Sequence, residues 1–325
     1  MSPNNTWKSR LMSSGIPLEF EVAKLLGNQG FSITSDYLYS RDDSGLLKDF
    51  SVDIRATRLL SDENLGRCDL ILLVECKYRI PASKWLFLPA PREEGIPNAR
   101  ASTLRLISEF SPLYPLKMDT ASTHVGLHPA GLDRQDLICY KGVEINLSSG
   151  DVYDKEIKHG ISQLQYALPR LITESIQANV TNASIDPKLG APFSFMPILI
   201  TTADIYVAKP GLVMKDVEGA SDIDEIASKS NYVTLLNDCG PDFERHALKE
   251  CQSLLDLVKT EYIKGMNQRI EQRNEHRLRT PVQVIKGIMD SDRYSRLYYF
   301  TSFLICNHAY LPTLLRRLVD YIIRV

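Results

Sequence analysis

The chain has 325 residues, of which 44% are hydrophobic and 24% are charged, and its formal net charge is −2. A chain of this size can bury one substantial core or two modest ones, as an ordinary globular protein does. Its 40 acidic and 38 basic residues exclude an overall basic field. Any contact with nucleic acid must therefore come from a local patch.

The cysteines and the N-terminal segment bear on the compartment. The six cysteines are scattered without a Cys-x-x-Cys pair, which argues against a zinc site or a disulfide framework. The first seven residues lack the apolar core of a signal peptide, and no apolar run approaches the ~20 residues of a membrane span. We expect a cytoplasmic protein without a membrane partner.

The first predicted element is a helix from about Pro17 to Asn28, which Gly30 ends. Glu19 lies at the margin of its apolar stripe, whereas Glu21 lies farther round, so Glu19 is the acid expected to face a sheet. The alternative is a solvated helix Glu. A first strand over 31–39 should follow. The stripe consists of Leu18, Val22, Leu25 and Leu26.

The most unusual stretch is the strand predicted over 70–78. Five aliphatic residues open it, as in a strand that is buried on both faces. Glu75 and Lys77 end it, and because strand side chains alternate, both point to one face. Burying a carboxylate and an ammonium costs several kcal/mol each unless they pair or meet an ion. The stretch therefore requires a third partner.

An upstream strand, predicted over 48–56, supplies that partner. Asp53 lies in it among apolar neighbours, and the polar link 61–67 is typical of a hairpin turn. Antiparallel pairing can bring Asp53 to Glu75 and Lys77. Two carboxylates beside one Lys leave a net negative site, which favours a cation. The alternative is a buried Asp–Glu–Lys network that only ties the two strands together.

These elements resemble the restriction-endonuclease-like superfamily, the PD-(D/E)xK nucleases. The superfamily pattern is a helix with a Glu, a strand, a strand with the Asp, and a strand with (Asp/Glu)-x-Lys. Glu19, Asp53 and Glu75-Cys76-Lys77 follow that order within about the first quarter of the chain, with Val52 in place of the Pro. The resemblance implies an α/β fold with a mixed-sheet core that is flanked by helices.

The resemblance also implies phosphodiester hydrolysis with Mg²⁺ or Mn²⁺. Asp53 and Glu75 would hold the first ion, and the Cys76 backbone carbonyl would complete the protein ligands. Lys77 would position the attacking water or stabilise the developing charge. Glu19 would hold that water or a second ion. The expected partner is nucleic acid, more specifically DNA than RNA. The expected role is in restriction or another anti-phage defence, together with a defence-system partner protein. A homodimer is a further expectation, since paired subunits often cut the two strands of a duplex.

Residues 79–150 are predicted to form an insertion that shapes a substrate cleft or a partner surface. Its first part is proline-rich and is predicted to be irregular. A helix over about 98–110 and a strand over 137–147 are predicted to follow. His124 and His128 have metal-like spacing, but without a helix signal or a third ligand nearby we interpret them as part of a loop.

A long helix from Tyr153 to about Gln177 and a buried strand or strand pair over 195–207 complete the predicted core, which is expected to end near residue 210. The order strand, helix, strand predicts a parallel crossover. The resemblance implies a Gln or another polar residue on this helix, and Gln163 is the matching residue. A polar helix flank explains Gln163 equally well. The apolar stripe of the helix consists of Ile157, Ile161, Leu164, Leu168 and Leu171.

Residues 211–325 are predicted to be mainly helical. We expect a short helix over 222–229, a strand over 231–237, a long helix over 241–275, a capped helix start at Thr280, a strand or buried helix over 298–305 and a last helix over 311–323. Basic residues recur in this region and could form a stripe against phosphates or a solvated face with Glu271 and Glu275. They are Arg269, Arg273, Arg277, Arg279, Lys286, Arg293 and Arg296.

Three hypotheses follow from these patterns. The leading one is a metal-dependent DNA endonuclease. The second is a nuclease-fold protein that binds nucleic acid or a partner without cutting. The third is a structural or regulatory module whose helical C-terminal half mediates assembly. The joint presence of Glu19, Asp53, Glu75 and Lys77 favours the first over the second, and the near balance of acids and bases keeps the third open.

Overall fold

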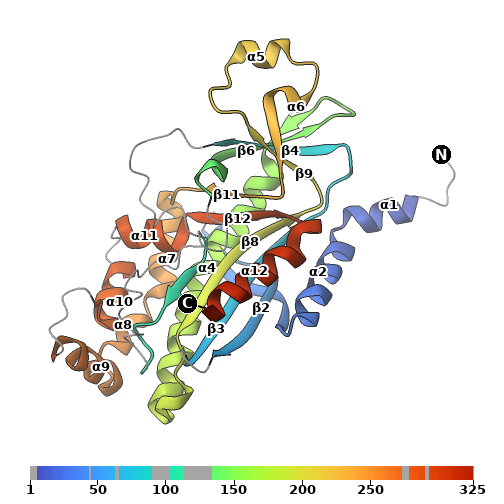
Figure 1. The fold of residues 1–325 in the computed structure, drawn as a ribbon. Helices are drawn as coiled ribbons and strands as arrows, with labels where there is room; N and C mark the ends of the chain where they lie inside the picture. The colour runs from blue at the N-terminus through green and yellow to red at the C-terminus, as the bar shows by residue number, and fades with distance from the viewer. Residues whose placement is uncertain are drawn as a thin grey trace.

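The computed structural model describes residues 6–43, 45–62, 66–89, 103–112, 134–272, 278–289 and 293–324. In this part of the chain a large mixed sheet is flanked by helices on both faces (Figure 1). The predicted α/β class is therefore confirmed. Within the described ranges, no helix combines the length and the apolar character needed to cross a membrane.

The strands are β1 Ser32–Asp43, β2 Leu46–Asp62, β3 Gly66–Lys77, β4 Ser83–Pro89, β5 Arg105–Ile107, β6 Ile138–Asn146, β7 Val152–Tyr153, β8 Phe193–Thr201, β9 Asp204–Ala208, β10 Ala227–Ser230, β11 Tyr232–Leu236 and β12 Ser302–Asn307. The helices are α1 Thr6–Ser13, α2 Ile16–Asn28, α4 Lys155–Ile185, α5 Met214–Gly219, α6 Ile223–Ile226, α7 Pro241–Cys251, α8 Leu254–Leu257, α9 Glu261–Gln272, α10 Pro281–Met289, α11 Arg293–Phe300 and α12 Leu311–Arg324. Short 3-10 turns are η3 Gln135–Leu137, η4 Pro187–Leu189 and η5 His308–Tyr310.

The first three strands form consecutive antiparallel pairs, of which the sequence predicts the pairing of β2 with β3. β1 pairs with β2 from Ser32↔Thr57 to Asp43↔Leu46, and β2 pairs with β3 from Ile54↔Val74 to Asp62↔Gly66. β1 and β2 are longer than predicted, because their outer halves carry polar residues that an exposed strand tolerates but that hide the apolar alternation. The helix predicted before them is confirmed as α2, with Leu18, Val22 and Leu26 buried.

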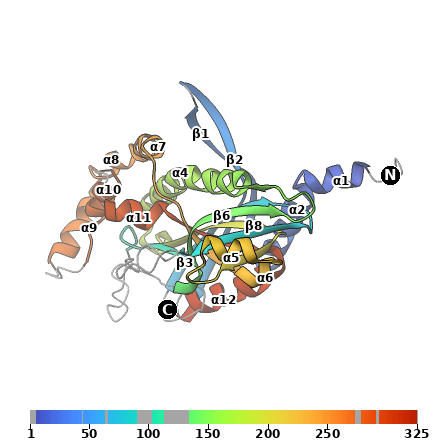
Figure 2. The same ribbon diagram turned by 90° about the horizontal axis from the view of Figure 1, so that it is seen from above.

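The predicted crossover is also confirmed. α4 follows β7, and β8 runs parallel to β3 from Asp69↔Phe193 to Lys77↔Thr201. All nine residues of β8 are buried, because α4 covers one face of the sheet and α12 covers the other (Figure 2). The predicted stripe of α4 is buried along its whole length, from Ile157 to Leu171.

Two expectations for residues 79–150 are wrong. β4 occupies part of the segment expected to be irregular, and its alternate side chains Trp85 and Phe87 are fully buried. β5 lies within the helix predicted over 98–110, of which residues up to 102 lie outside the described part. The strand predicted over 137–147 is confirmed as β6. His124 and His128 also lie outside the described residues.

The C-terminal part of the chain contributes strands to the same sheet. The strand order is β1-β2-β3-β8-β12-β11-β6-β4-β9-β10, with β5 beside β8 and β7 beside β6. β12 lies between β8, to which it is parallel, and β11, to which it is antiparallel. The sheet therefore continues across the boundary predicted near residue 210.

The helix predicted over 241–275 is broken in the structure. Its described part forms α7, α8 and α9, separated by turns near Ser253 and Thr260. The Thr260 hydroxyl donates to the carbonyl of Leu257 at 2.6 Å, and such local side-chain bonds compete with helix continuation. The capped start at Thr280 is confirmed, because its N–H donates to Gln283 Oε1 at 2.8 Å and the Gln283 N–H donates to Thr280 Oγ1 at 3.2 Å.

Of the three members of the predicted basic stripe whose side chains are described, Arg269 and Arg279 contact other parts of the protein and Lys286 is exposed. Arg279 Nη2 lies 2.6 Å from Glu109 Oε1, and the two side chains are 26% and 2% exposed. Arg269 donates to the carbonyl of Pro112. Arg273, Arg277 and the side chains of Arg293 and Arg296 lie outside the described part. Arg269 and Arg279 thus tie the C-terminal helices to segment 103–112.

The replacement Glu109→Ala is expected to destabilise the fold by about 3–5 kcal/mol, because it leaves the Arg279 guanidinium partly buried without its counter-ion. The matched control is Asp136→Ala, which removes an ion pair with Arg134 whose side chains are both 59% exposed. We expect that change to cost less than about 1 kcal/mol. Urea unfolding monitored by circular dichroism would measure both. Equal losses would contradict a structural role for the Glu109–Arg279 pair.

Candidate active site

The predicted site residues meet where the pairing of β2 and β3 ends. Ile54 pairs with Val74, so Asp53 and Glu75 occupy the next cross-strand positions. The Asp53 Oδ2 atom accepts a hydrogen bond of 2.7 Å from the Cys76 N–H. The Asp53 carboxylate is thereby fixed beside the backbone of the Glu75-Cys76-Lys77 segment.

Lys77 is held by two side chains. Its Nζ donates to Glu75 Oε1 at 2.6 Å and to Gln163 Oε1 at 3.3 Å. Gln163, on α4, donates in turn from Nε2 to the carbonyl of Ser51 on β2 at 3.0 Å. The structure therefore brings Gln163 into contact with Lys77, and its amide links the ammonium to the strand that carries Asp53.

Two buried carboxylates near this end of the sheet differ in how they are paired. Glu75 and Glu144 are each only 1% exposed. Both oxygens of Glu144 accept hydrogen bonds, which come from Arg79, Trp85 and Tyr153. Glu75 accepts from Lys77 through Oε1, and the backbone N–H of Asp53 also lowers the pKa of this carboxyl, but its buried Oε2 has no hydrogen-bond partner among the described residues. A buried carboxylate oxygen without a partner is costly and marks a place where a cation can bind.

The electrostatics of the site are those of crowded acids. Burial, followed by the negative charge of Asp53, raises the pKa of Glu75 to about 8, although Lys77 opposes the shift. Burial also raises the pKa of Asp53, and the Cys76 N–H and the Lys77 charge oppose it. A single ammonium therefore does not neutralise the carboxylates around it, and a divalent cation would lower the free energy of their ionised forms.

Glu19 lies at the edge of this group. Burial raises its pKa, and the charges of Asp53 and Asp36 raise it further. Its Oε1 atom is close to Gly15, where an added Cβ would lie 3.1 Å away, and Gly15 has a left-handed φ of 84°. Glu19 is thus within electrostatic reach of Asp53 and Lys77, and it can act through a water or a second ion.

The donor set fits a hard ion that keeps part of its water shell. Within the described ranges, no group of three or more His, Cys, Asp or Glu side chains is arranged to hold a metal ion. Mg²⁺, however, is usually bound through one or two carboxylates and retains several waters. Asp53, Glu75 and a backbone carbonyl are sufficient for such an ion. The unpartnered Oε2 of Glu75 is the observation that supports this fit.

Sequence reasoning missed two residues of β1 near the site. Asp36 has a φ of 52° and its charge raises the pKa of both Asp53 and Glu19. Tyr39 is buried, its hydroxyl lacks a partner among the described residues, and burial raises its pKa with a contribution from the charge of Glu75. Tyr37, Tyr39 and Arg41 alternate along one strand, and this pattern could have indicated that the strand presents polar groups to one face of the sheet.

We compared the chain with protein-family models, with curated proteins and with solved structures, and none of the three comparisons gave a match.

Proposed function

We propose that this protein is a Mg²⁺- or Mn²⁺-dependent nuclease of the PD-(D/E)xK type that hydrolyses phosphodiester bonds in DNA. The observation that carries the proposal is the half-partnered, buried carboxylate of Glu75 beside Asp53 and Lys77. A purely structural network would pair both oxygens, as the Glu144 network does.

The order of elements supports the same proposal. α2 carries Glu19, β2 carries Asp53, β3 carries Glu75 and Lys77, and α4 leads to the parallel strand β8. This is the order of the superfamily pattern that the sequence resembles. The contact of Gln163, on α4, with Lys77 is consistent with the polar residue that the resemblance implies on this helix.

The proposed mechanism gives each residue of the site a function. Asp53, Glu75 and the Cys76 carbonyl would hold the divalent ion, which when bound supplies Lewis acidity toward the phosphate and a water of lowered pKa. Lys77 would donate from Nζ to the attacking water or to a phosphate oxygen on which charge develops. Gln163 positions Lys77 by holding it against the backbone of Ser51. Glu19 would orient water at the edge of the site.

The direct test is incubation of the purified protein with plasmid, linear duplex and single-stranded DNA in the presence of Mg²⁺, Mn²⁺ or EDTA. We expect cleavage with either ion and none with EDTA. An Asp53→Asn protein purified in the same way controls for contaminating nucleases. Equal cleavage by both proteins would point to contamination, and a lack of cleavage under every condition would favour a nuclease-fold module that binds without cutting.

A further inference from the structure

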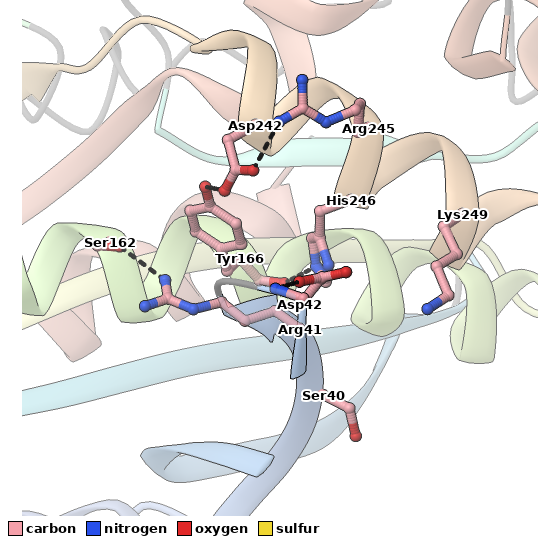
Figure 3. A pocket seen from close by; sticks show the side chains of 10 residues that line it. Ser40, Arg41, Asp42, Ser162, Tyr166, Asp242, Arg245, His246 and Lys249 are labelled. Carbon is pink, nitrogen blue, oxygen red and sulfur yellow. Dashed lines mark hydrogen bonds and ion pairs between the residues drawn. The ribbon is translucent and has the colours of Figure 1, made fainter. Parts of the chain in front are cut away.

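A cleft of about 640 Å³ lies between the outer end of β1, α4 and α7 (Figure 3). Three permanent cations line it, namely Arg41, Arg245 and Lys249, together with two acids, Asp42 and Asp242. α7 belongs to the C-terminal part of the chain, so this cleft is formed by segments about 200 residues apart in sequence.

Arg41 is held in a fixed orientation in this cleft. Its guanidinium carbon lies 4.2 Å from the centroid of the Phe50 ring and 4.7 Å from that of the Tyr166 ring. Its Nη1 donates to Ser162 Oγ at 3.4 Å, as Figure 3 shows. Within the described residues we find no carboxylate that forms an ion pair with it. A guanidinium that is oriented by two rings and lacks a counter-ion is well suited to a phosphate, because its planar fork matches phosphate oxygens.

The two acids of the cleft are occupied by other groups. Asp242 accepts hydrogen bonds from the Tyr166 hydroxyl at 2.8 Å and from Arg245 at 3.0 Å. Asp42 Oδ1 accepts a hydrogen bond from the Gly45 N–H at 2.7 Å. Lys249 forms no ion pair in the part of the chain that the structure describes. Arg41 and Lys249 therefore remain as cations available to an anionic ligand.

The cleft adjoins the candidate active site through α4 and β1. Ser162 contacts Arg41, and the next residue, Gln163, contacts Lys77. Tyr39 stacks on Phe50 at a centroid distance of 5.8 Å. The charges of Arg41 in the cleft and of Glu75 in the candidate site both act on the pKa of Tyr39. A strand whose phosphate reaches Lys77 would thus extend along α4 into this cleft.

We propose that Arg41, assisted by Lys249, binds a backbone phosphate of the nucleic-acid strand close to the scissile one. This inference rests on the proposed function, since it identifies where the substrate of that site continues. It assigns to the cleft a sequence-independent contact that raises affinity and fixes the position of the strand.

The test is the salt dependence of binding, measured by fluorescence anisotropy with a labelled 20-base-pair duplex in EDTA, so that the DNA is not cut. Arg41→Met removes the charge but keeps an unbranched side chain between the two rings. We expect the slope of log K against log salt to fall in magnitude by about 1 and the affinity at 0.1 M salt to fall roughly tenfold, as for the loss of one phosphate contact. Lys249→Met should lower the slope in the same direction.

The matched control is Arg58→Met. Arg58 lies on β2 with its guanidinium 5.9 Å from the Phe31 ring, outside the cleft, and its loss should leave the slope unchanged. Thermal unfolding of all variants tests whether they fold. An Arg41→Met protein that folds and binds with the wild-type slope would overturn the inference and leave the nuclease proposal intact. A wild-type protein that binds DNA in an Arg41-dependent manner without cutting it would overturn the nuclease proposal alone, and a wild-type protein that does not bind DNA would overturn both.

Discussion

Replacing Asp53 with Asn should abolish DNA cleavage without disturbing the fold. The amide oxygen of Asn can still accept the hydrogen bond from the Cys76 N–H, which is 2.7 Å long, so the junction of β2 and β3 is preserved. The neutral amide no longer offers an anionic ligand to the divalent ion. Loss of several kcal/mol of transition-state stabilisation corresponds to a reduction in cleavage rate of about 10³-fold or more. Single-turnover cleavage in Mg²⁺ would measure it.

The same variant should be slightly more stable than the wild type when metal is absent. The charge of Asp53 raises the pKa of Glu75 and of Glu19, so these acids repel one another in the folded state. Removing that charge is expected to raise the Tm in EDTA by roughly 2 °C. A substitution that lowers activity and raises stability is typical of a functional site. If Asp53 belonged to a purely structural network, the removal of its charge would instead lower the Tm.

Asp69→Asn is the matched control for both measurements. Asp69 lies on β3 and burial raises its pKa, but the charge acting on it is that of Arg67 and not that of a second acid. This variant should retain cleavage. Equal loss of cleavage in both variants would contradict the metal-binding role of Asp53, whereas wild-type cleavage by Asp53→Asn would point to a contaminating nuclease.

The parts of the fold that the sequence predicted correctly are those with a strong local pattern. Local sequence alone determines three of them, because each pattern lies within a single strand or within a few turns of one helix. They are the aliphatic run of β3, the apolar stripe of α4 and the proline-initiated helix α2. β4 and β5 were missed, because prolines and polar residues obscure their alternation. Their strand conformation depends on pairing with β6, β8 and β9, which lie far away in sequence.

The same distinction applies to the candidate site. Asp53, Glu75 and Lys77 lie in two neighbouring strands, so the hairpin alone could bring them together. The contact of Gln163 with Lys77 requires the crossover through α4, which the sequence indicated only as one of two equal alternatives. The cleft around Arg41 could not be predicted, since it depends on where α7 packs against α4.

The stability of the metal-free protein should fall as the pH rises from about 4.5 to about 8. The ordinary pKa of a Glu side chain is 4.5, and that of Glu75 is raised to about 8 in the folded protein. Between these values the folded state binds a proton that the unfolded state has lost, so the unfolding free energy decreases with pH. The stabilising contribution is complete below about 4.5 and is lost as the pH passes through about 8. Each unit of pKa difference corresponds to about 1.4 kcal/mol, so the total is on the order of a few kcal/mol.

Urea unfolding in EDTA at pH 5, 6.5 and 8, for the wild type and for Glu75→Gln, would isolate this contribution. Burial lowers the pKa of His159 and His246, which makes stability rise with pH, so only the difference between the two proteins reports on Glu75. We expect the variant to lose less stability across this range. Mg²⁺ should stabilise the wild type more at pH 8 than at pH 5, because the ion competes with the proton for the same carboxylate. An identical pH dependence in the two proteins would show that Glu75 does not hold a proton in the folded state, and it would remove the electrostatic argument for a cation beside Asp53.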